Sequence, residues 1–361
     1  MKRIFAGTAA GLLVAVLLFP VKAGAVSARS CCVLDAVSGR TLFEKEADRR
    51  SLIASTTKIM TALLIAEQCN VLDRMRIPGE AVGIEGSSMY LREGEVLTLQ
   101  ELLYGLMLSS GNDAAVALAV YCGGTVQGFV EMMNDKARLL GLTGTHFENP
   151  NGLDAPEHYS TARDLAVLAA YAMENPIFAK TVSTKTAAVG SRYLRNHNKL
   201  LWLVAGADGV KTGFTKAAGR ILVSSASRQN RRLIVVTLND PNDWQDHEAL
   251  LNEGFSRFTL TKLISAGDQI GEQEIVGGTV DRVPVIAAED FSYALAPEET
   301  VTTMLSLRSP VFAPVAEGED AGFAYILLNG KAVDKIPVTY GRTSEQKQEE
   351  PQKPFRFLRK R

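Results

Sequence analysis

The sequence is poor in the residues that build disulfide frameworks. Only four of its 361 residues are cysteines. Their spacing matches no zinc or haem pattern, and they are too few to form a disulfide framework in a chain of this size. Free thiols or a single bridge are the two interpretations that remain open. The cysteines are Cys31, Cys32, Cys69 and Cys122.

Histidine is equally scarce. None of the four histidines belongs to an H-E-x-x-H or similar metal-binding pattern. The sequence therefore predicts no metal and no cofactor, and it favours structural or surface roles for the histidines. They are His146, His158, His197 and His247.

Neither sign of charge prevails. Lysine and arginine together number 39, against 40 aspartates and glutamates. A chain that binds nucleic acid usually carries a basic excess, so no nucleic acid partner is expected. The length and the 46% hydrophobic content predict a globular protein of about two domains.

The N-terminus has the order of a secretory signal peptide. Two basic residues precede an apolar run that ends at Phe19, and Pro20 and the small residues 23–25 follow. We therefore predict a signal peptide over residues 1–25. An uncleaved membrane anchor is the alternative, although the run is short for a bilayer span. Both interpretations place the rest of the chain outside the cytoplasm, in the cell envelope.

The pattern between residues 31 and 260 predicts strands at both ends and helices between them. A Ser-Gly turn within residues 31–50 separates two β-prone runs, and residues 219–238 form a second probable hairpin. Apolar residues recur at helical spacing in residues 97–121, 129–140 and 160–176. This region is therefore expected to fold as an α+β domain.

Beyond residue 260 the composition changes to short β-prone runs separated by glycine, proline and acidic residues. This predicts a separate small β domain. The end of the chain is polar and then basic, with aromatic residues interleaved. Peripheral contact with an anionic membrane and a solvated tail both suit that composition. The predicted divisions are 1–25 for the signal peptide, 26–260 for the main domain, 261–341 for the β domain and 342–361 for the tail.

Ser55 and Lys58 lie three residues apart in LIASTTKIMTALLIAEQ, where a polar stretch becomes an apolar helical run. Residues three apart are neighbours on a helix surface, so the hydroxyl and the amine can meet there. The pair suits a nucleophile and its base. A capped helix start with a solvated lysine is the alternative that this segment alone leaves open.

Two further segments favour the catalytic interpretation. LMLSSGNDAA carries Ser110-Gly111-Asn112 in an expected loop between helices, and GADGVKTGFT carries Lys211-Thr212-Gly213 at the entry to a strand. In order, the segments give S-x-x-K, S-x-N and K-T-G, the set known from serine β-lactamases and penicillin-binding proteins. The combination predicts acyl transfer through a serine.

With these motifs in view, the chain resembles the D-alanyl-D-alanine carboxypeptidases, the low-molecular-mass penicillin-binding proteins that trim peptidoglycan stem peptides. The similarity covers nearly all of the exported chain and includes FENPNGLDAPEHYSTARDLA and HEALLNEGF. It implies an α+β fold, with a DD-peptidase/β-lactamase-like catalytic domain whose antiparallel sheet is flanked by helices and a helical subdomain. A small all-β C-terminal domain would follow. It also implies a peptidoglycan pentapeptide ending in D-Ala-D-Ala as substrate, and β-lactam antibiotics as inhibitors.

The catalytic roles combine chemistry with this resemblance. Ser55, at a helix start, would be the nucleophile, and its free backbone N–H would stabilise an oxyanion. The resemblance implies the N–H of Phe214 as the second donor. Lys58 can act as the base only if its pKa falls well below about 10.4, which burial and the nearby cation Lys211 can achieve. Ser110 would relay the proton to the leaving amine.

Substrate recognition is assigned through the resemblance alone. Asn112 would hydrogen-bond the substrate amide, and Thr212 and Thr215 would face the terminal carboxylate. His197 lies in a segment that approaches the site in relatives, and it is expected to shape the pocket. The expected substrate-binding residues are Asn112, Lys211, Thr212, Gly213, Phe214 and Thr215.

One departure from the family pattern affects recognition of the carboxylate. Many relatives carry an arginine shortly before the helix that contains LLNEGF, but the stretch NDPNDWQDHEALL has none. Recognition is therefore expected to depend on Lys211, Thr212 and Thr215, which makes a strict preference for a free C-terminus less certain.

Three alternative functions stay open. A DD-endopeptidase or a β-lactamase would use the same site, and a non-catalytic envelope protein would keep the fold alone. For a β-lactamase, Glu148 is the tempting base. However, the β-lactamase pattern is E-x-x-x-N, and Gly152 stands where the asparagine would be.

Overall fold

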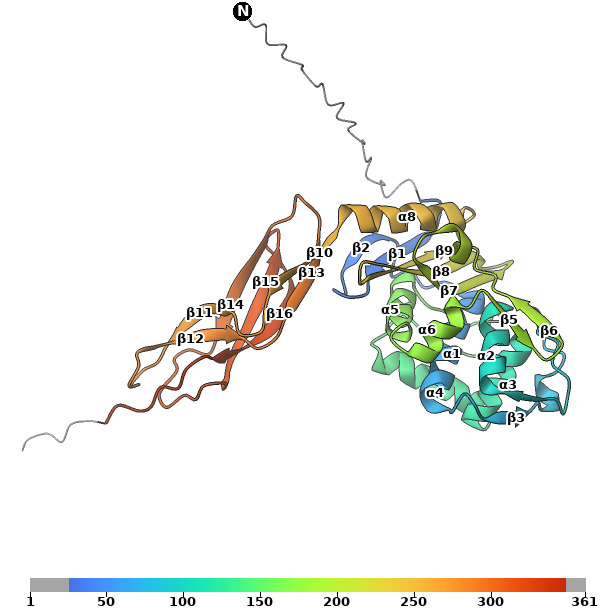
Figure 1. Cartoon of the computed structure of the whole chain (residues 1–361), viewed down its shortest axis with the longest axis horizontal. Coiled ribbons are helices and arrows are strands. Elements are labelled where there is room, and N and C mark those ends of the chain that lie inside the picture. Colours follow the sequence, from blue (N-terminus) through green and yellow to red (C-terminus); the bar gives the residue numbers. More distant parts are fainter. Residues whose placement is uncertain (1–25, 349–361) are drawn as a thin grey trace, which may run out of the picture.

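The computed structural model describes residues 26–348. The predicted signal peptide and most of the predicted tail therefore lie outside the described residues. Figure 1 shows a larger part with helices around a sheet, joined end to end with a smaller part built of strands. The predicted α+β class with a trailing all-β domain is confirmed.

An antiparallel five-stranded sheet forms the centre of the larger part. Its order is β2-β1-β9-β8-β7, so strands from both ends of the domain meet in it, and both predicted hairpins are present. β1 is buried along its whole length, because both faces of the sheet are covered. The strands are β1 (Ser30–Asp35), β2 (Thr41–Lys45), β7 (Ala207–Thr215), β8 (Gly219–Arg228) and β9 (Arg231–Leu238).

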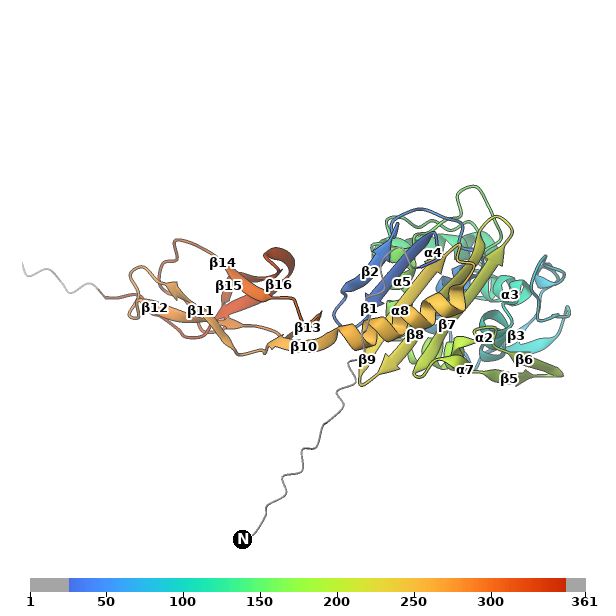
Figure 2. The same ribbon diagram turned by 90° about the horizontal axis from the view of Figure 1, so that it is seen from above.

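Helices cover both faces of this sheet. The helices are α1 (Lys58–Gln68), α2 (Leu99–Leu108), α3 (Asn112–Gly123), α4 (Val126–Leu139), α5 (Ala162–Ala172), α6 (Pro176–Ser183), α7 (Leu200–Leu203) and α8 (Asp243–Arg257). Figure 2 shows α8 lying across one face. Cys31 and Val33 of β1 pack on that side, whereas Cys32 and Leu34 join the core formed with α1 to α6.

Local signals fix the helix starts. Thr98 and Glu101 form a capping box at α2, in which each side chain accepts a hydrogen bond from the other residue's backbone N–H. The Thr161 side chain accepts from the backbone N–H of Asp164 at the start of α5. The helical pattern over residues 97–121 forms two helices, because the chain breaks at Ser110, whose φ is 61°.

Two short hairpins border the helical subdomain. They are β3 (Arg74–Arg76) with β4 (Val96–Thr98), and β5 (Thr186–Val189) with β6 (Arg192–Arg195). Within residues 26–348, no single helix is long and apolar enough to cross a membrane, and the sharply bent pair α3 and α4 reaches that length and hydropathy only when joined.

The smaller part has its own core. A five-stranded antiparallel sheet in the order β11-β12-β16-β15-β14 packs with the pair β10 and β13. In β12 every second side chain is buried, which is the period of a strand with one face on the core. The strands are β10 (Thr259–Ile264), β11 (Gln269–Glu274), β12 (Arg282–Ala287), β13 (Phe291–Leu295), β14 (Val301–Leu307), β15 (Asp320–Leu328) and β16 (Lys331–Tyr340).

Arg40, which follows β1, links the two parts. Its guanidinium donates to the Glu299 carboxylate at 2.5 Å and to the Ala294 carbonyl at 2.5 Å, and both charged side chains are only 12% exposed. The same guanidinium lies 5.1 Å from the ring centre of Phe258 and 5.3 Å from that of Tyr293. This half-buried bidentate pair, with the two rings beside it, joins the larger part to the smaller part.

His247 of α8 is fully buried against the sheet and makes the fold sensitive to acid. Its ring nitrogens bond the hydroxyls of Ser224 at 2.6 Å and Thr237 at 2.9 Å. Burial lowers the pKa of His247 to about 3, whereas an unfolded histidine titrates near 6.5. Between about pH 6.5 and about pH 3 this histidine is protonated in the unfolded chain and neutral in the folded chain. The free energy of unfolding therefore falls as the pH is lowered through this range.

We expect acidification from pH 7 to pH 5 to lower the free energy of unfolding by about 2 kcal/mol through this ring alone. Urea unfolding of the wild type and of His247→Gln at both pH values measures it. The loss on acidification should be smaller in the variant by that amount. An equal loss in the two proteins would contradict the prediction.

Candidate active site

Ser55 lies in a 3-10 turn, Ala54–Thr57, that runs directly into α1. The turn is closed by the Ile53 carbonyl, which accepts from the backbone N–H of Thr56 at 3.1 Å and from its hydroxyl at 2.6 Å. Ser55 and Lys58 therefore lie one helical turn apart, and Lys58 Nζ is 3.0 Å from Ser55 Oγ. The hydroxyl and the amine meet in this turn.

Lys58 is completely buried, and its hydrogen-bond partners are neutral groups. Its Nζ donates to Asn112 Oδ1 at 2.7 Å and to the Asn151 carbonyl at 2.5 Å, besides the contact with Ser55. Burial, and then the charge of Lys211, lower the pKa of Lys58 well below its ordinary value. An amine with this pKa can take a proton from the serine at neutral pH.

Ser110 lies in the loop between α2 and α3, and Asn112 is the first residue of α3. The Asn112 amide group donates to the Glu85 carbonyl at 2.5 Å, and its backbone N–H donates to the Ser87 carbonyl at 2.7 Å. The adjacent Asp113 is buried and accepts from the backbone N–H of Met89 and Leu91 and from Ser88 Oγ, so it holds the loop over residues 87–91 beside the site. The sequence analysis missed Asp113, which lies directly after the S-x-N motif.

Lys211 to Phe214 are on β7, the edge strand of the sheet. Lys211 is buried, its Nζ donates to the Thr212 carbonyl at 2.9 Å, and burial lowers the pKa of Lys211 to about 7. A Cβ on Gly213 would lie 3.2 Å from the Ile53 carbonyl oxygen and 3.4 Å from the backbone N of Ser55. Glycine therefore allows β7 to pack closely against the serine turn.

The loop 147–153 supports the same turn from another side. Gly152 has φ +87°, and a Cβ there would lie 1.9 Å from the Ala54 carbonyl oxygen, so no other residue fits. His158 accepts from the Glu148 backbone N–H at 3.1 Å, and its other nitrogen is 2.7 Å from Thr57 Oγ1. The segment FENPNGLDAPEH thus forms the wall behind Ser55.

These elements surround a hollow of about 290 Å³. Five of the predicted site residues line it, whereas Lys58 and Lys211 are buried and do not line it. His197, predicted to shape the pocket, lies in the wall. The lining residues are Ser55, Ser87, Ser110, His197, Thr212, Gly213, Phe214, Arg220, Ile221, Asp243 and Trp244.

Thr215 and Asn112 are the other two predicted site residues that do not line the hollow. The Thr215 hydroxyl donates to Asp154 at 3.1 Å and accepts from the Ala218 N–H at 3.0 Å. Both polar groups of the Asn112 side chain are engaged by Lys58 and Glu85. Of Lys211, Thr212 and Thr215, the three residues expected to bind the carboxylate, Thr212 alone lines the hollow.

Arg220, Asp243 and Trp244 are pocket residues that the sequence analysis did not find. Arg220 is on β8, and Asp243 and Trp244 begin α8. The residues come together only because β8 pairs with β7 and α8 crosses the sheet. No local motif marks them, although Asp243 and Trp244 fall in the stretch that lacks the family arginine.

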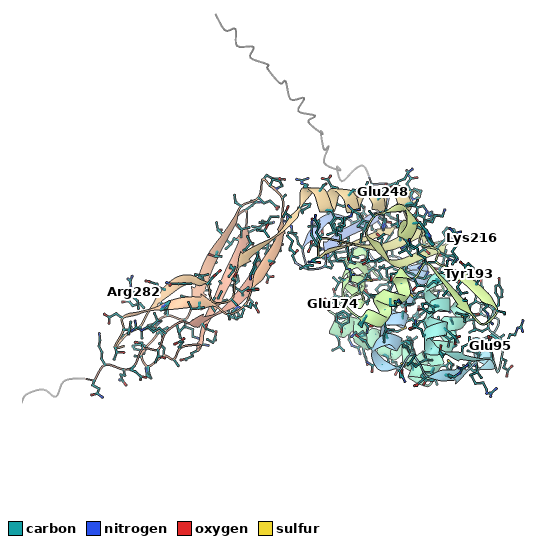
Figure 3. All side chains as sticks on the ribbon, in the orientation of Figure 1. Glu95, Glu174, Tyr193, Lys216, Glu248 and Arg282 are labelled. Carbon is teal, nitrogen blue, oxygen red and sulfur yellow. The ribbon has the colours of Figure 1, made fainter. Side chains whose placement is uncertain are left out.

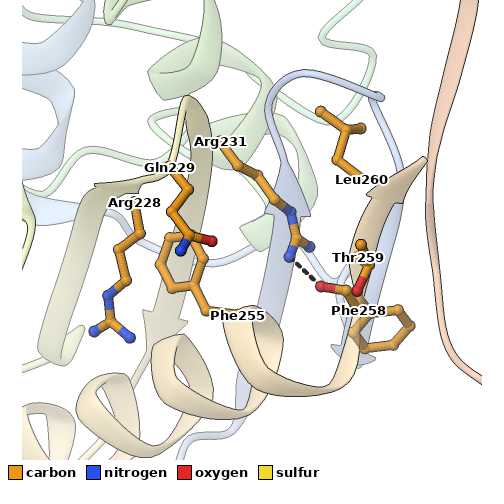
Figure 4. Close-up of a pocket in the computed structure, with 7 residues that line it drawn as sticks. All are labelled: Arg228, Gln229, Arg231, Phe255, Phe258, Thr259 and Leu260. Atoms are coloured by element: carbon orange, nitrogen blue, oxygen red, sulfur yellow. Dashed lines mark hydrogen bonds between the residues drawn. The ribbon is translucent and has the colours of Figure 1, made fainter. Parts of the chain in front are cut away.

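A second hollow, of about 350 Å³, lies near the other end of α8 (Figure 4). Arg231, in its wall, donates to the Phe258 carbonyl at 2.5 Å and is paired with the buried Asp35. Its charge is therefore used within the fold. The lining contains no serine, cysteine or histidine, so the chemistry belongs to the first hollow. The lining residues are Arg228, Gln229, Arg231, Phe255, Phe258, Thr259 and Leu260.

No metal centre is visible in the part of the chain that the structure describes. Residues 26–348 contain no group of three or more histidine, cysteine, aspartate or glutamate side chains arranged to hold an ion. The Cys69 and Cys122 thiols hydrogen-bond each other, and all four cysteines are free.

Two family models match the chain. Residues 19–242 match the D-alanyl-D-alanine carboxypeptidase family, and residues 258–346 match the C-terminal domain of penicillin-binding protein 5. The chain is 30% identical to D-alanyl-D-alanine carboxypeptidase DacF of Bacillus subtilis, over 86% of this chain and 84% of the relative.

Solved structures agree with the sequence comparison. Penicillin-binding protein 5 of Haemophilus influenzae is similar with a TM-score of 0.79 and 31% identity, over 89% of this chain and 98% of that one. A mutant DD-transpeptidase of Streptomyces is similar with a TM-score of 0.62 and 35% identity, over 64% of this chain and 98% of that one. Since the matched residues include all three motifs around one hollow, the chain belongs to the D-alanyl-D-alanine carboxypeptidase family of penicillin-binding proteins.

Proposed function

We propose that this chain removes the terminal D-alanine from peptidoglycan stem peptides ending in D-Ala-D-Ala, through an acyl-enzyme on Ser55. The contact that carries the proposal is the 3.0 Å distance between Ser55 Oγ and Nζ of the fully buried Lys58. Because burial and Lys211 lower the pKa of Lys58, its neutral amine takes the hydroxyl proton as the oxygen attacks the penultimate D-alanine carbonyl.

The oxyanion that then forms needs hydrogen-bond donors. The backbone N–H of Ser55 at the start of its turn and that of Phe214 on β7 are the two candidates, and Gly213 brings the two backbones together. Each donor of this kind typically lowers the barrier by about 3 kcal/mol. Because β7 is an edge strand, an extended substrate can lie along its outer side.

Collapse of this intermediate breaks the bond to the terminal D-alanine. The proton that Lys58 took from Ser55 passes through the hydroxyl of Ser110, which lines the hollow, to the leaving amine. Free D-alanine departs and Lys58 is neutral again. Water then attacks the ester on Ser55, and the shortened peptide leaves with a new carboxylate. β-Lactams carry a strained amide in place of the scissile bond, so we propose that they acylate the same serine.

Little supports a β-lactamase function. Glu148 is exposed, does not line the hollow, and accepts a hydrogen bond from the Glu157 N–H at 2.7 Å. The acyl-enzyme therefore lacks this residue as a base for rapid release of the drug. A long-lived penicillin adduct is consistent with a carboxypeptidase and not with a β-lactamase.

The test combines two measurements on the purified protein. Intact mass is followed after adding benzylpenicillin, and release of D-alanine is measured from a diacetyl-L-Lys-D-Ala-D-Ala peptide. We expect an adduct that persists for minutes and D-alanine release that the drug blocks. Absence of both would overturn the catalytic proposal, and drug destruction without an adduct would favour a β-lactamase. A cross-linked muropeptide dimer tests for endopeptidase activity.

We also propose that the chain acts in the cell envelope, exported by the signal peptide over residues 1–25. The mature protein would consist of a catalytic domain at 26–260 and a β domain at 261–341, and the basic tail at 342–361 would contact an anionic membrane peripherally. Sedimentation of the full chain with anionic and with neutral lipid vesicles tests that contact. Equal binding to both vesicles would contradict it.

A further inference from the structure

The hollow needs a cation for the carboxylate that ends the substrate. Two lining residues, His197 and Arg220, carry basic side chains. Burial, and then the charge of Lys211, lower the pKa of His197, which leaves that ring neutral at pH 7. Lys211, buried behind the lining, has a pKa of about 7 and is charged only part of the time. Arg220 is thus the one permanent cation among the residues that line the hollow.

The strand register gives Arg220 the right reach. It is paired directly opposite Phe214 across β7 and β8. Opposite residues in an antiparallel pair have Cβ atoms about 5 Å apart on the same face. The substrate carboxylate lies one residue, about 3.8 Å, beyond the carbonyl that the Phe214 N–H would hold. A long side chain from position 220 can therefore reach it.

Asp243 fixes the direction of this side chain. Both of its carboxylate oxygens accept from Arg220 Nη2, at 2.6 and 2.7 Å. Asp243 is itself buried at the first turn of α8 and accepts from the Trp244 N–H at 2.9 Å. The guanidinium also lies 5.7 Å from the Trp244 ring centre. Removing rotamer freedom before the substrate arrives lowers the entropic cost of binding.

The guanidinium keeps donors for a further ligand. Both bonds to Asp243 use Nη2, and Nη1 donates to no residue in the described range 26–348. Nε is buried and has no partner in the same range. The Arg220 side chain is 42% exposed, so solvent and a ligand can approach it. A fork with free donors beside a serine nucleophile suits a carboxylate.

We propose that Arg220, oriented by Asp243, binds the C-terminal carboxylate of the substrate and sets the preference for a free C-terminus. The inference rests on the proposed function of the same site. It replaces the earlier expectation that Lys211, Thr212 and Thr215 suffice. Asp243 comes from the stretch that lacks the family arginine. It orients Arg220, an arginine of β8 that would take over the role of the missing one.

The test compares two acylating compounds that differ in one charge, benzylpenicillin and its methyl ester. We expect Arg220→Gln to lower the second-order acylation rate for benzylpenicillin by about 30-fold to 100-fold, the lower end of the range for loss of one partner of a hydrogen-bonded charge pair, because Arg220 is partly exposed. The acylation rate with the methyl ester should change by less than about 3-fold, because the ester carries no carboxylate for Arg220 to bind. Arg220→Lys should recover part of the rate with benzylpenicillin.

Two further variants separate recognition from structural damage. Arg220→Gln combined with Asp243→Asn removes the carboxylate that the first change leaves unpaired, and it should show the same selective loss. Arg228→Gln, at the far end of β8, should match the wild type with both compounds. An equal loss with both compounds, or no loss, would overturn the role of Arg220. A wild type that neither compound acylates would overturn the proposed function itself.

Discussion

Replacing Ser55 with alanine is expected to abolish both the penicillin adduct and the release of D-alanine. No other side chain is expected to replace it, since Ser55 is the one serine within residues 26–348 to which Lys58 donates a hydrogen bond. Loss of a catalytic nucleophile typically lowers turnover by about 10⁴-fold or more. Intact mass after incubation with benzylpenicillin gives the adduct, and peptide mapping of the wild type should locate it on the segment that contains Ser55.

A matched control keeps this result specific. Ser256→Ala changes an exposed serine of α8, and it should form the adduct at the rate of the wild type. Circular dichroism and thermal unfolding of Ser55→Ala should agree with the wild type, because a small side chain is lost from a partly exposed position. An adduct on Ser55→Ala would assign the nucleophile to another residue.

Replacing Lys58 with methionine is expected to slow acylation by about 10²-fold to 10⁴-fold, the usual contribution of a general base. Methionine fills much of the same buried volume but cannot take the Ser55 proton. In the wild type the rate should fall as the pH is lowered through the depressed pKa of Lys58, because a protonated amine is no base. The rate of the variant should lack this dependence. Stopped-flow acylation over a pH series measures both.

Lys216 supplies the control for Lys58. It is exposed at the turn between β7 and β8, as Figure 3 shows, and Lys216→Met should leave the acylation rate and its pH dependence unchanged. If Lys58→Met acylated as fast as the wild type, the base would have to be another group. If Lys58→Met instead lost both acylation and thermal stability, Lys58→Arg would distinguish lost packing from a lost base. Arginine keeps a long side chain at this position but stays protonated.

The features that could be predicted from the sequence depend on residues close together in the chain. The contact between Ser55 and Lys58 depends only on a spacing of three in a helical turn, and the hairpin of β8 and β9 depends on a polar turn between two β-prone runs. The break at Ser110 follows from a polar loop between two apolar helical runs. Such features lie within a few residues of one another, so periodicity and turn composition reveal them.

The remaining features of the site depend on contacts between distant segments. Arg220 meets Asp243 because α8 returns across the sheet, and Gly152 meets Ala54 because a loop nearly a hundred residues further along the chain folds back. No spacing in the sequence encodes these pairs. Thr215 is two residues from Gly213 on β7, yet its hydroxyl bonds Asp154 and Ala218 and does not line the hollow. Its orientation could be known only once the loop that contains Asp154 was located.

The ion pair between Arg40 and Glu299 opposes bending between the two parts of the molecule. Bending at the junction would separate the Arg40 guanidinium from the Glu299 carboxylate and from the flanking Phe258 and Tyr293 rings. While these contacts hold, the distance from Ser55 to the far end of the β part stays nearly the same. If the far end of the β part were held at a surface, this distance would set how far from that surface Ser55 acts.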